Sequence, residues 1–278
     1  MDREEALKLA AKLAAEAPEP EVVDEELDVE VELDEDIDEG TPLQELITLL
    51  EQRIGTYGFL SRLYFKEMDK PFLDEMHDAL YPVETGDPDM DTGYLYIATY
   101  LSNLWTESIH ELSVDFSKCY FGNGVDAYSA AYPYESVYPS EKRLMMEKAR
   151  QQVFEIFREN GITKSKDWHE GEDHIALEME FERVICGRTI DALKAGDERE
   201  SYRLLKLQYD FLRNHLANWV PMMTADLRRF AQTKLYQGLA YLTDGFLRTD
   251  LQFLKNLLFD EVETEESDEF SFEGDGGE

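Results

Sequence analysis

The sequence predicts an all-α protein, an irregular bundle of about ten helices. Apolar residues recur at steps of three and four along most of the 278-residue chain, which is typical of helices with one buried face. Few stretches alternate between apolar and polar residues as strands do, and the 16 glycines are few for the turns of a sheet protein. The 43% of hydrophobic residues can build a substantial core.

Residues 1–42 are expected to form an acidic, largely disordered tail. A short helix is predicted over residues 3–17, where alanine, leucine and lysine follow a helical spacing, and Pro18 and Pro20 end it. The acidic stretch that follows has few apolar residues and repels itself, so it should not pack. We interpret it as a solvating tail; an autoinhibitory segment that competes for acidic contacts is the alternative.

An N-terminal helical lobe is predicted over residues 43–121. Thr41 is suited to be the N-cap of its first helix, because Pro42 then takes the first helical position. The three helices of this lobe are expected over residues 43–64, 71–81 and 94–120. A loop rich in glycine, aspartate and proline separates the second helix from the third.

Residues 122–139 are predicted to form an ordered hinge. Gly122 and Gly124 end the preceding helix, and the aromatic residues and prolines that follow have no helical period. A C-terminal helical lobe is expected over residues 140–259. Its helices are predicted over residues 140–158, 173–194, 197–216, 220–236, 237–247 and 250–259. Residues 260–278 hold 10 acidic residues and no basic one, and form a second acidic tail.

Charge is concentrated at the two ends of the chain. Of the formal net charge of −35, −14 belongs to residues 1–42 and −10 to residues 260–278, which leaves −11 for the residues between them. Nucleic-acid binding depends on lysine and arginine contacts, so a basic ligand is favoured over nucleic acid. The lack of a secretory signal and of an apolar run of about 18 residues predicts a cytoplasmic protein without a membrane anchor.

The segment 168–174 carries the most specific signal. Glu170, Glu172, Asp173 and His174 stand directly before an apolar helical pattern. If these residues served only to cap the helix, one acid would be enough, with Asp173 as the N-cap. The larger number favours contact with a ligand, because carboxylates accept hydrogen bonds from arginine or lysine and histidine can change its charge near neutral pH.

A catalytic metal site is the alternative for this segment. His169 and His174 are five residues apart, which on a helix would point them about 140° from each other. This differs from the spacing of four that places two histidine ligands on one helical face. The chain also has no phosphate-binding glycine loop, no Gly-x-Ser-x-Gly elbow and no Cys-x-x-Cys motif. We therefore expect no enzyme activity, no cofactor and no bound metal.

Several segments resemble the TorD/DmsD family of redox-enzyme maturation chaperones. Glu170-Gly-Glu-Asp-His174 is similar to the family's Glu-Pro-x-Asp-His motif, with Gly171 in place of the proline. Residues 57–64, 133–138 and 211–221 resemble its first core helix, its segment between lobes and its late helix pair. The resemblance covers approximately residues 43–258 in the expected order. It implies a TorD-like all-α chaperone, a monomer or a domain-swapped dimer with crossover at the hinge.

The resemblance also implies a function. The chain would bind the twin-arginine signal peptide of a molybdenum (molybdopterin) oxidoreductase subunit in its apo form, and hold it until the cofactor is loaded. We expect Glu170 and Asp173 to contact the basic motif and His174 to fix the loop. The apolar part of the peptide would be bordered by Tyr134, Tyr132 and Trp105. A metal-dependent phosphohydrolase using His169, Asp173 and His174, and an adaptor that recruits basic partners through its acidic tails, are the alternatives.

Overall fold

The computed structural model describes residues 41–122, 130–138, 148–166 and 168–268. Within these ranges the regular structure consists of nine α-helices and one 3₁₀ turn, and contains no strand beyond a single isolated bridge. The predicted all-α class is therefore confirmed. The expected helix over residues 3–17, the start of the helix at Ser140 and the acidic segments 1–40 and 269–278 lie outside the described residues.

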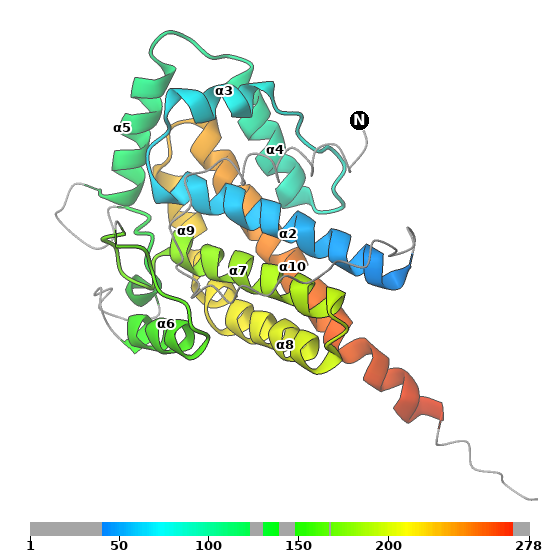
Figure 1. Ribbon diagram of the computed structural model, residues 1–278. Coiled ribbons are helices and arrows are strands. Elements are labelled where there is room, and N and C mark those ends of the chain that lie inside the picture. Colours follow the sequence, from blue (N-terminus) through cyan, green and yellow to red (C-terminus); the bar gives the residue numbers. More distant parts are fainter. Residues whose placement is uncertain (1–40, 123–129, 139–147, 167, 269–278) are drawn as a thin grey trace, which may run out of the picture.

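Figure 1 shows the helices in their order along the chain. They are α2 (Pro42–Phe65), α3 (Lys70–Asp78), α4 (Pro88–Leu101), α5 (Ser108–Tyr120), the 3₁₀ turn η1 (Glu135–Val137), α6 (Lys148–Glu159), α7 (Ile175–Lys194), α8 (Glu198–Asn214), α9 (Leu216–Phe230) and α10 (Lys234–Asp268). In the described part of the chain, no helix is long and apolar enough to cross a membrane.

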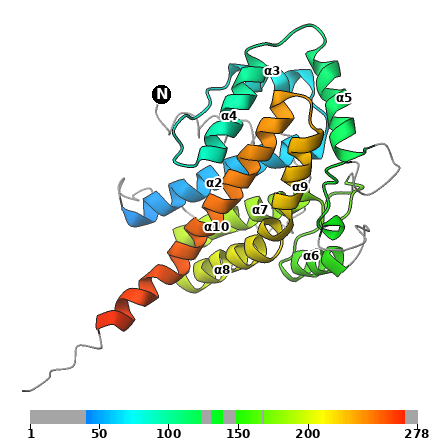
Figure 2. The ribbon, with the colours of Figure 1, turned by 180° about the vertical axis from the view of Figure 1, so that it is seen from behind.

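Helix α10 is the central helix of the bundle. It runs past α4, α9 and α8, and its last turns extend beyond the other helices (Figures 1 and 2). Glycines bring α4 and α10 into close contact: a Cβ added at Gly93 would lie 2.6 Å from the backbone nitrogen of Leu242, and one at Gly238 would lie 2.7 Å from the Gly93 carbonyl oxygen. A larger residue at either position would force the two helices apart.

The hydrophobic core is shared by helices from both ends of the sequence. Helix α2 packs along α7, and α4 packs along α10, so each pair joins elements from the two sides of residues 122–139. The core includes Leu60 of α2, Phe181 of α7, Phe211 of α8 and Leu242 of α10. The division into two lobes joined by a hinge therefore stays a prediction.

Three predicted helix assignments are wrong. The helix expected over residues 220–236 is interrupted at residues 231–233, between α9 and α10. The single helix expected over residues 94–120 is divided into α4 and α5, because the chain turns after Leu101 and the Trp105 N–H bonds to the Ser108 hydroxyl oxygen at 2.8 Å. Conversely, residues 237–247 and 250–259 belong to one continuous helix, α10. Gly238 resembles a helix break in the sequence, but its lack of a side chain serves the contact with α4.

Candidate functional site

The 170–174 loop and the segment that contains η1 are held side by side. Tyr134 and His174 form an isolated antiparallel bridge. The flanking hydrogen bonds run from the Glu135 N–H to the Asp173 carbonyl at 2.9 Å, from the Ile175 N–H to the Pro133 carbonyl at 3.0 Å, and from the Ser136 N–H to Asp173 Oδ2 at 3.1 Å. The structure therefore brings together Tyr134 and the acidic loop, two parts of the predicted site that lie 36 residues apart at Tyr134 and Glu170.

His174 is a buried structural residue, only 4% exposed. Its Nδ1 accepts a hydrogen bond from the Ala176 N–H at 3.1 Å, which makes His174 the N-cap of α7. Burial lowers its pKa to about 3, so the ring is neutral near pH 7. The rings of Tyr134 and Trp168 meet it edge-on, with centroid distances of 5.1 and 5.5 Å. The expected role of His174 in fixing the loop fits this geometry.

Asp173 is also buried, with 2% of its surface exposed. Its carbonyl and its carboxylate both accept backbone N–H groups, those of Glu135 and Ser136. The packing interpretation that made Asp173 the N-cap of α7 is wrong, because the cap is His174 and the Asp173 carboxylate points to η1 instead. Direct contact between Asp173 and a ligand stays a prediction.

Glu170 is the exposed acid of this loop. Its carboxylate accepts a hydrogen bond from the Tyr134 hydroxyl, and the Lys164 ammonium group donates to its backbone carbonyl at 2.6 Å. Burial and the Glu170 charge raise the pKa of Tyr134, so the hydroxyl keeps its proton and remains a donor. Glu170 therefore presents a carboxylate to solvent from a loop that is fixed at its backbone.

Glu172 is held by cations of this same chain. Arg150 Nε lies 2.7 Å from its Oε2, and Lys164 Nζ lies 2.9 Å from its Oε1. Partial burial acts to raise the pKa of Glu172, but these two cations outweigh it and hold the pKa below its ordinary value. Glu172 therefore anchors the loop to α6, whereas Glu170 has no lysine or arginine side chain within ion-pair distance among the described residues.

A buried polar network lies beneath η1, and sequence reasoning missed it. His215 Nδ1 lies 2.8 Å from Glu135 Oε2, and the Trp219 indole N–H donates to Glu178 Oε2 at 3.0 Å. Burial, with a contribution from Glu135, raises the pKa of Glu178 well above its ordinary value. The signal in the sequence was Glu178 on the apolar face of a helix that must be buried, three residues after Ile175.

The two remaining site residues differ in position. Tyr132 is half-buried against the core, next to the bridge at Tyr134. Trp105 is 59% exposed and lies before the first residue of α5, where its indole N–H donates to Glu111 Oε2 at 3.4 Å. The 130–138 segment contacts α5 at its other end, where the Ala131 N–H donates a hydrogen bond to the Cys119 carbonyl. Cys119 lies roughly 17 Å along the helix axis from the first residue of α5. The structure does not bring Trp105 to the loop.

The geometry gives no support to a metal site. In the part of the chain that the structure describes, no group of three or more histidine, cysteine, aspartate or glutamate side chains is placed to hold a metal ion. His174 Nδ1 is occupied by the Ala176 N–H, and the Asp173 carboxylate is occupied by the Ser136 N–H. The predicted phosphohydrolase cluster of His169, Asp173 and His174 is therefore not assembled.

Fold and site together define an all-α protein with an acidic loop at its surface. The pattern of the nitrate reductase delta subunit family matches residues 87–225, half of the chain. Chaperone protein TorD of Vibrio cholerae is 28% identical over 223 residues, which cover 77% of this chain and 97% of the relative. Chaperone protein TorD of Photobacterium profundum is 27% identical over 218 residues, which cover 76% and 98%.

The chain belongs to the TorD/DmsD family of redox-enzyme maturation chaperones. A third relative, chaperone protein TorD of Aliivibrio salmonicida, is 26% identical over 220 residues and is covered over 99% of its length. The family resemblance found in the sequence is confirmed. So is the prediction that the protein is no enzyme, because these relatives are chaperones.

Proposed function

We propose that this chaperone binds the twin-arginine signal peptide of a molybdopterin oxidoreductase subunit and assists the maturation of that subunit before export. Membership of the TorD/DmsD family supports the chaperone role. The peptide class is supported by chemistry, because paired arginines followed by an apolar stretch require carboxylates next to an apolar surface.

The observation that carries the proposal is the exposed Glu170 carboxylate on a fixed loop. Asp173, His174 and Glu172 each use their side chains to hold the loop in place. Glu170 accepts the Tyr134 hydroxyl and has further lone pairs directed to solvent. An arriving guanidinium group would find a carboxylate that is already oriented, so less conformational entropy is lost on binding.

In this proposal Asp173 and His174 act as positioning residues. They fix η1 and the start of α7, and through the bridge they fix Tyr134. Tyr134 and Tyr132 then border the peptide next to Glu170. The acidic surface of the protein adds a long-range attraction for a cationic peptide, which accelerates the encounter more than it strengthens the complex.

Calorimetry with two synthetic peptides tests the proposal. One peptide carries two adjacent arginines followed by an apolar stretch, and the other has both arginines replaced by glutamine. The first should bind about tenfold more tightly, which corresponds to about 1.4 kcal/mol. Increasing salt should reduce this difference, because an exposed ion pair is screened. Equal affinity for the two peptides would contradict a site that recognises paired arginines.

A further inference from the structure

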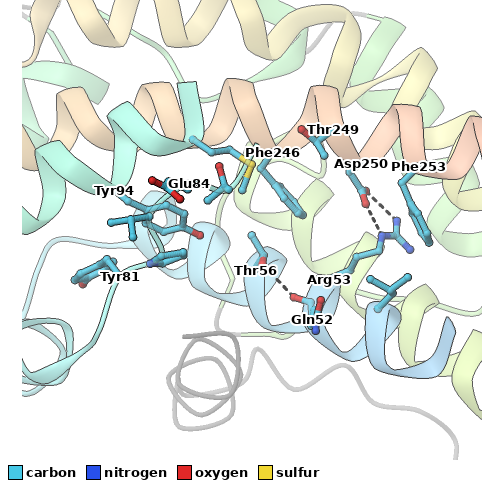
Figure 3. A pocket seen from close by; sticks show the side chains of 15 residues that line it. Gln52, Arg53, Thr56, Tyr81, Glu84, Tyr94, Phe246, Thr249, Asp250 and Phe253 are labelled. Atoms are coloured by element: carbon cyan, nitrogen blue, oxygen red, sulfur yellow. Dashed lines mark hydrogen bonds and ion pairs between the residues drawn. The ribbon is translucent and has the colours of Figure 1, made fainter. Parts of the chain in front are cut away.

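A cavity lies between α2 and α10, away from the 170–174 loop, and the proposed function does not use it. Its volume is about 310 Å³. It runs between the two helices from Tyr81 and Tyr94 at one end to the pair formed by Arg53 and Asp250 at the other, with Phe246 between them (Figure 3). The segment 81–85 closes its outer side. An elongated cavity along two helices, lined mainly by apolar surface that includes four aromatic rings, fits a peptide segment with apolar side chains.

Arg53 and Asp250, the charged residues at one end of the cavity, are already paired with each other. Arg53 Nε lies 2.5 Å from Asp250 Oδ1, Arg53 Nη2 lies 2.9 Å from Asp250 Oδ2, and the Tyr57 hydroxyl donates to Asp250 Oδ2 at 2.6 Å. Gln208 accepts a further hydrogen bond from Arg53. A small charged ligand would have to break these contacts, whereas an apolar occupant can leave them intact. The chemistry therefore favours an apolar occupant.

The outer wall of the cavity is preformed. The Thr85 N–H and hydroxyl each donate to Asp91 Oδ1 at 2.8 Å, and Arg248 of α10 bonds to Asp87 and Asp89 at the start of α4. On this wall the Val83 side chain is 82% exposed. A segment that entered the cavity past this fixed wall would cover Val83 and remove its apolar surface from water.

We propose that the cavity is the docking site of residues 3–17 of this same chain. The sequence of this segment predicts an amphipathic helix. Its apolar residues Ala6, Leu9, Ala10, Leu13 and Ala17 recur at steps of three and four, and Lys8 and Lys12 fall on the opposite side. The three basic residues of the first 42 all lie in this segment, and they suit a body of negative charge with Glu84 on the cavity wall.

The chain length between segment and cavity suits this docking. Residues 18–40 join the segment to Thr41, the N-cap of α2, and α2 itself forms one side of the cavity from Leu49 to Thr56. These positions lie roughly 12–22 Å along the helix from Thr41. A neutral flexible linker of this length spans roughly 25–30 Å on average, and the 13 acidic residues of 18–40 repel one another and extend it further. The linker is therefore long enough to reach the cavity, with an effective concentration on the order of 1 mM.

Thiol cross-linking within the full chain tests the docking. Ala14→Cys, at the edge of the apolar stripe, is combined with Val83→Cys at the cavity or with Val114→Cys on α5, which is exposed at 39%. The native Cys119 and Cys186 are buried and do not compete for the reagent. A short bismaleimide should link positions 14 and 83 within one chain, several times more than positions 14 and 114. Leu9→Asp with Leu13→Asp should abolish this link.

Three results of the cross-linking would overturn the proposal. They are equal yields at positions 83 and 114, no link at position 83, and links formed only between two chains. The last result would assign the cavity to a second copy of the protein. Mass spectrometry of the cross-linked protein distinguishes them.

A peptide of residues 1–18 provides a second test. It should bind the full chain that carries Leu9→Asp and Leu13→Asp, because the tethered segment can no longer occupy the cavity. For a free-peptide Kd on the order of 100 µM, the tethered segment of the parental chain should weaken peptide binding about tenfold. Adding Val83→Asp should weaken binding to the open chain. Equal affinity for the parental and the open chain would overturn the proposal.

Discussion

Because His174 is buried and neutral, we predict an effect of pH on the stability of the protein that can be measured without any ligand. The ring is 4% exposed, its Nδ1 accepts the Ala176 N–H, and burial lowers its pKa from 6.5 to about 3. We replace it in the variant His174→Asn, because asparagine can still cap the helix but does not titrate. The two proteins should therefore respond differently to acid.

The sign and size of the difference follow from proton binding. Below pH 6.5 the unfolded chain takes up a proton on His174, whereas the folded chain does so only near its pKa of about 3. The free energy of unfolding therefore falls as the pH is lowered through this window, by up to about 1.4 kcal/mol per pH unit. Between pH 7.5 and pH 5 the loss from this residue amounts to about 2 kcal/mol.

Urea unfolding of the parent and of His174→Asn at pH 7.5 and at pH 5 measures this loss. The variant should unfold more easily at pH 7.5, because it loses the ring contacts with Tyr134 and Trp168. This deficit should shrink by about 2 kcal/mol at pH 5. Glu178 and Glu182, whose pKa burial raises, act in the opposite direction, but they are common to both proteins. A deficit that is the same at both pH values would refute a buried, neutral His174.

Substitutions at three further positions test the packing around the two polar clusters by the same urea unfolding at pH 7.5. Asp173→Ala removes the acceptor of the buried Ser136 N–H and should cost about 2 kcal/mol, whereas Asp173→Asn should recover most of this loss. Asp250→Ala removes the carboxylate that is hydrogen-bonded to the buried Arg53 guanidinium and leaves only Glu182, 3.9 Å away, so it should cost about 3–5 kcal/mol. A loss below about 1 kcal/mol would mean that the Arg53–Asp250 pair is not desolvated. Gly171→Ala would place a Cβ 2.7 Å from Asp173 Oδ1 and should cost about 1 kcal/mol, so an unchanged stability would contradict this close approach.

The starts of α2 and α8 and the pattern of the core could be predicted from the sequence because they depend on neighbouring residues. Thr41 accepts the Gln44 N–H at 3.2 Å, and Asp197 accepts the Glu200 N–H at 2.9 Å. Thr41 was expected as a cap, and the helix predicted over residues 197–216 was expected to begin at Asp197. The spacing of apolar residues predicted which faces are buried, since helical periodicity reflects burial directly.

The helix ends and breaks that were predicted wrongly depend on distant partners. Gly238 and Asp250 look unfavourable inside a helix. In the fold Gly238 allows α4 to approach α10, and Asp250 binds Arg53 of α2. These contacts stabilise α10 as one helix against the local preference of its residues. The partners of Gly238 and Asp250 are more than a hundred residues away in the sequence, so no local sequence pattern indicates these contacts.

The candidate site was predicted in its location but not in its division of roles. The sequence showed an unusual number of ionisable residues over 170–174, and the structure places that loop beside Tyr134. Which acid is exposed could not be predicted, because Asp173 and Glu172 are removed from solvent by contacts with η1 and α6. The cavity between α2 and α10 also escaped prediction, because three separate segments of the chain form it.

The central claim is that Glu170 meets an arginine of a bound peptide. The most direct measurement is a double-mutant cycle by calorimetry, using Glu170→Gln and the paired-arginine and paired-glutamine peptides. Glu198→Gln, at the exposed start of α8, is the matched control, about 30 Å away along α7. Glu170→Gln should weaken the arginine peptide about fivefold and leave the glutamine peptide unchanged, with no effect in the control. Equal weakening of both peptides, or of neither, would contradict the claim.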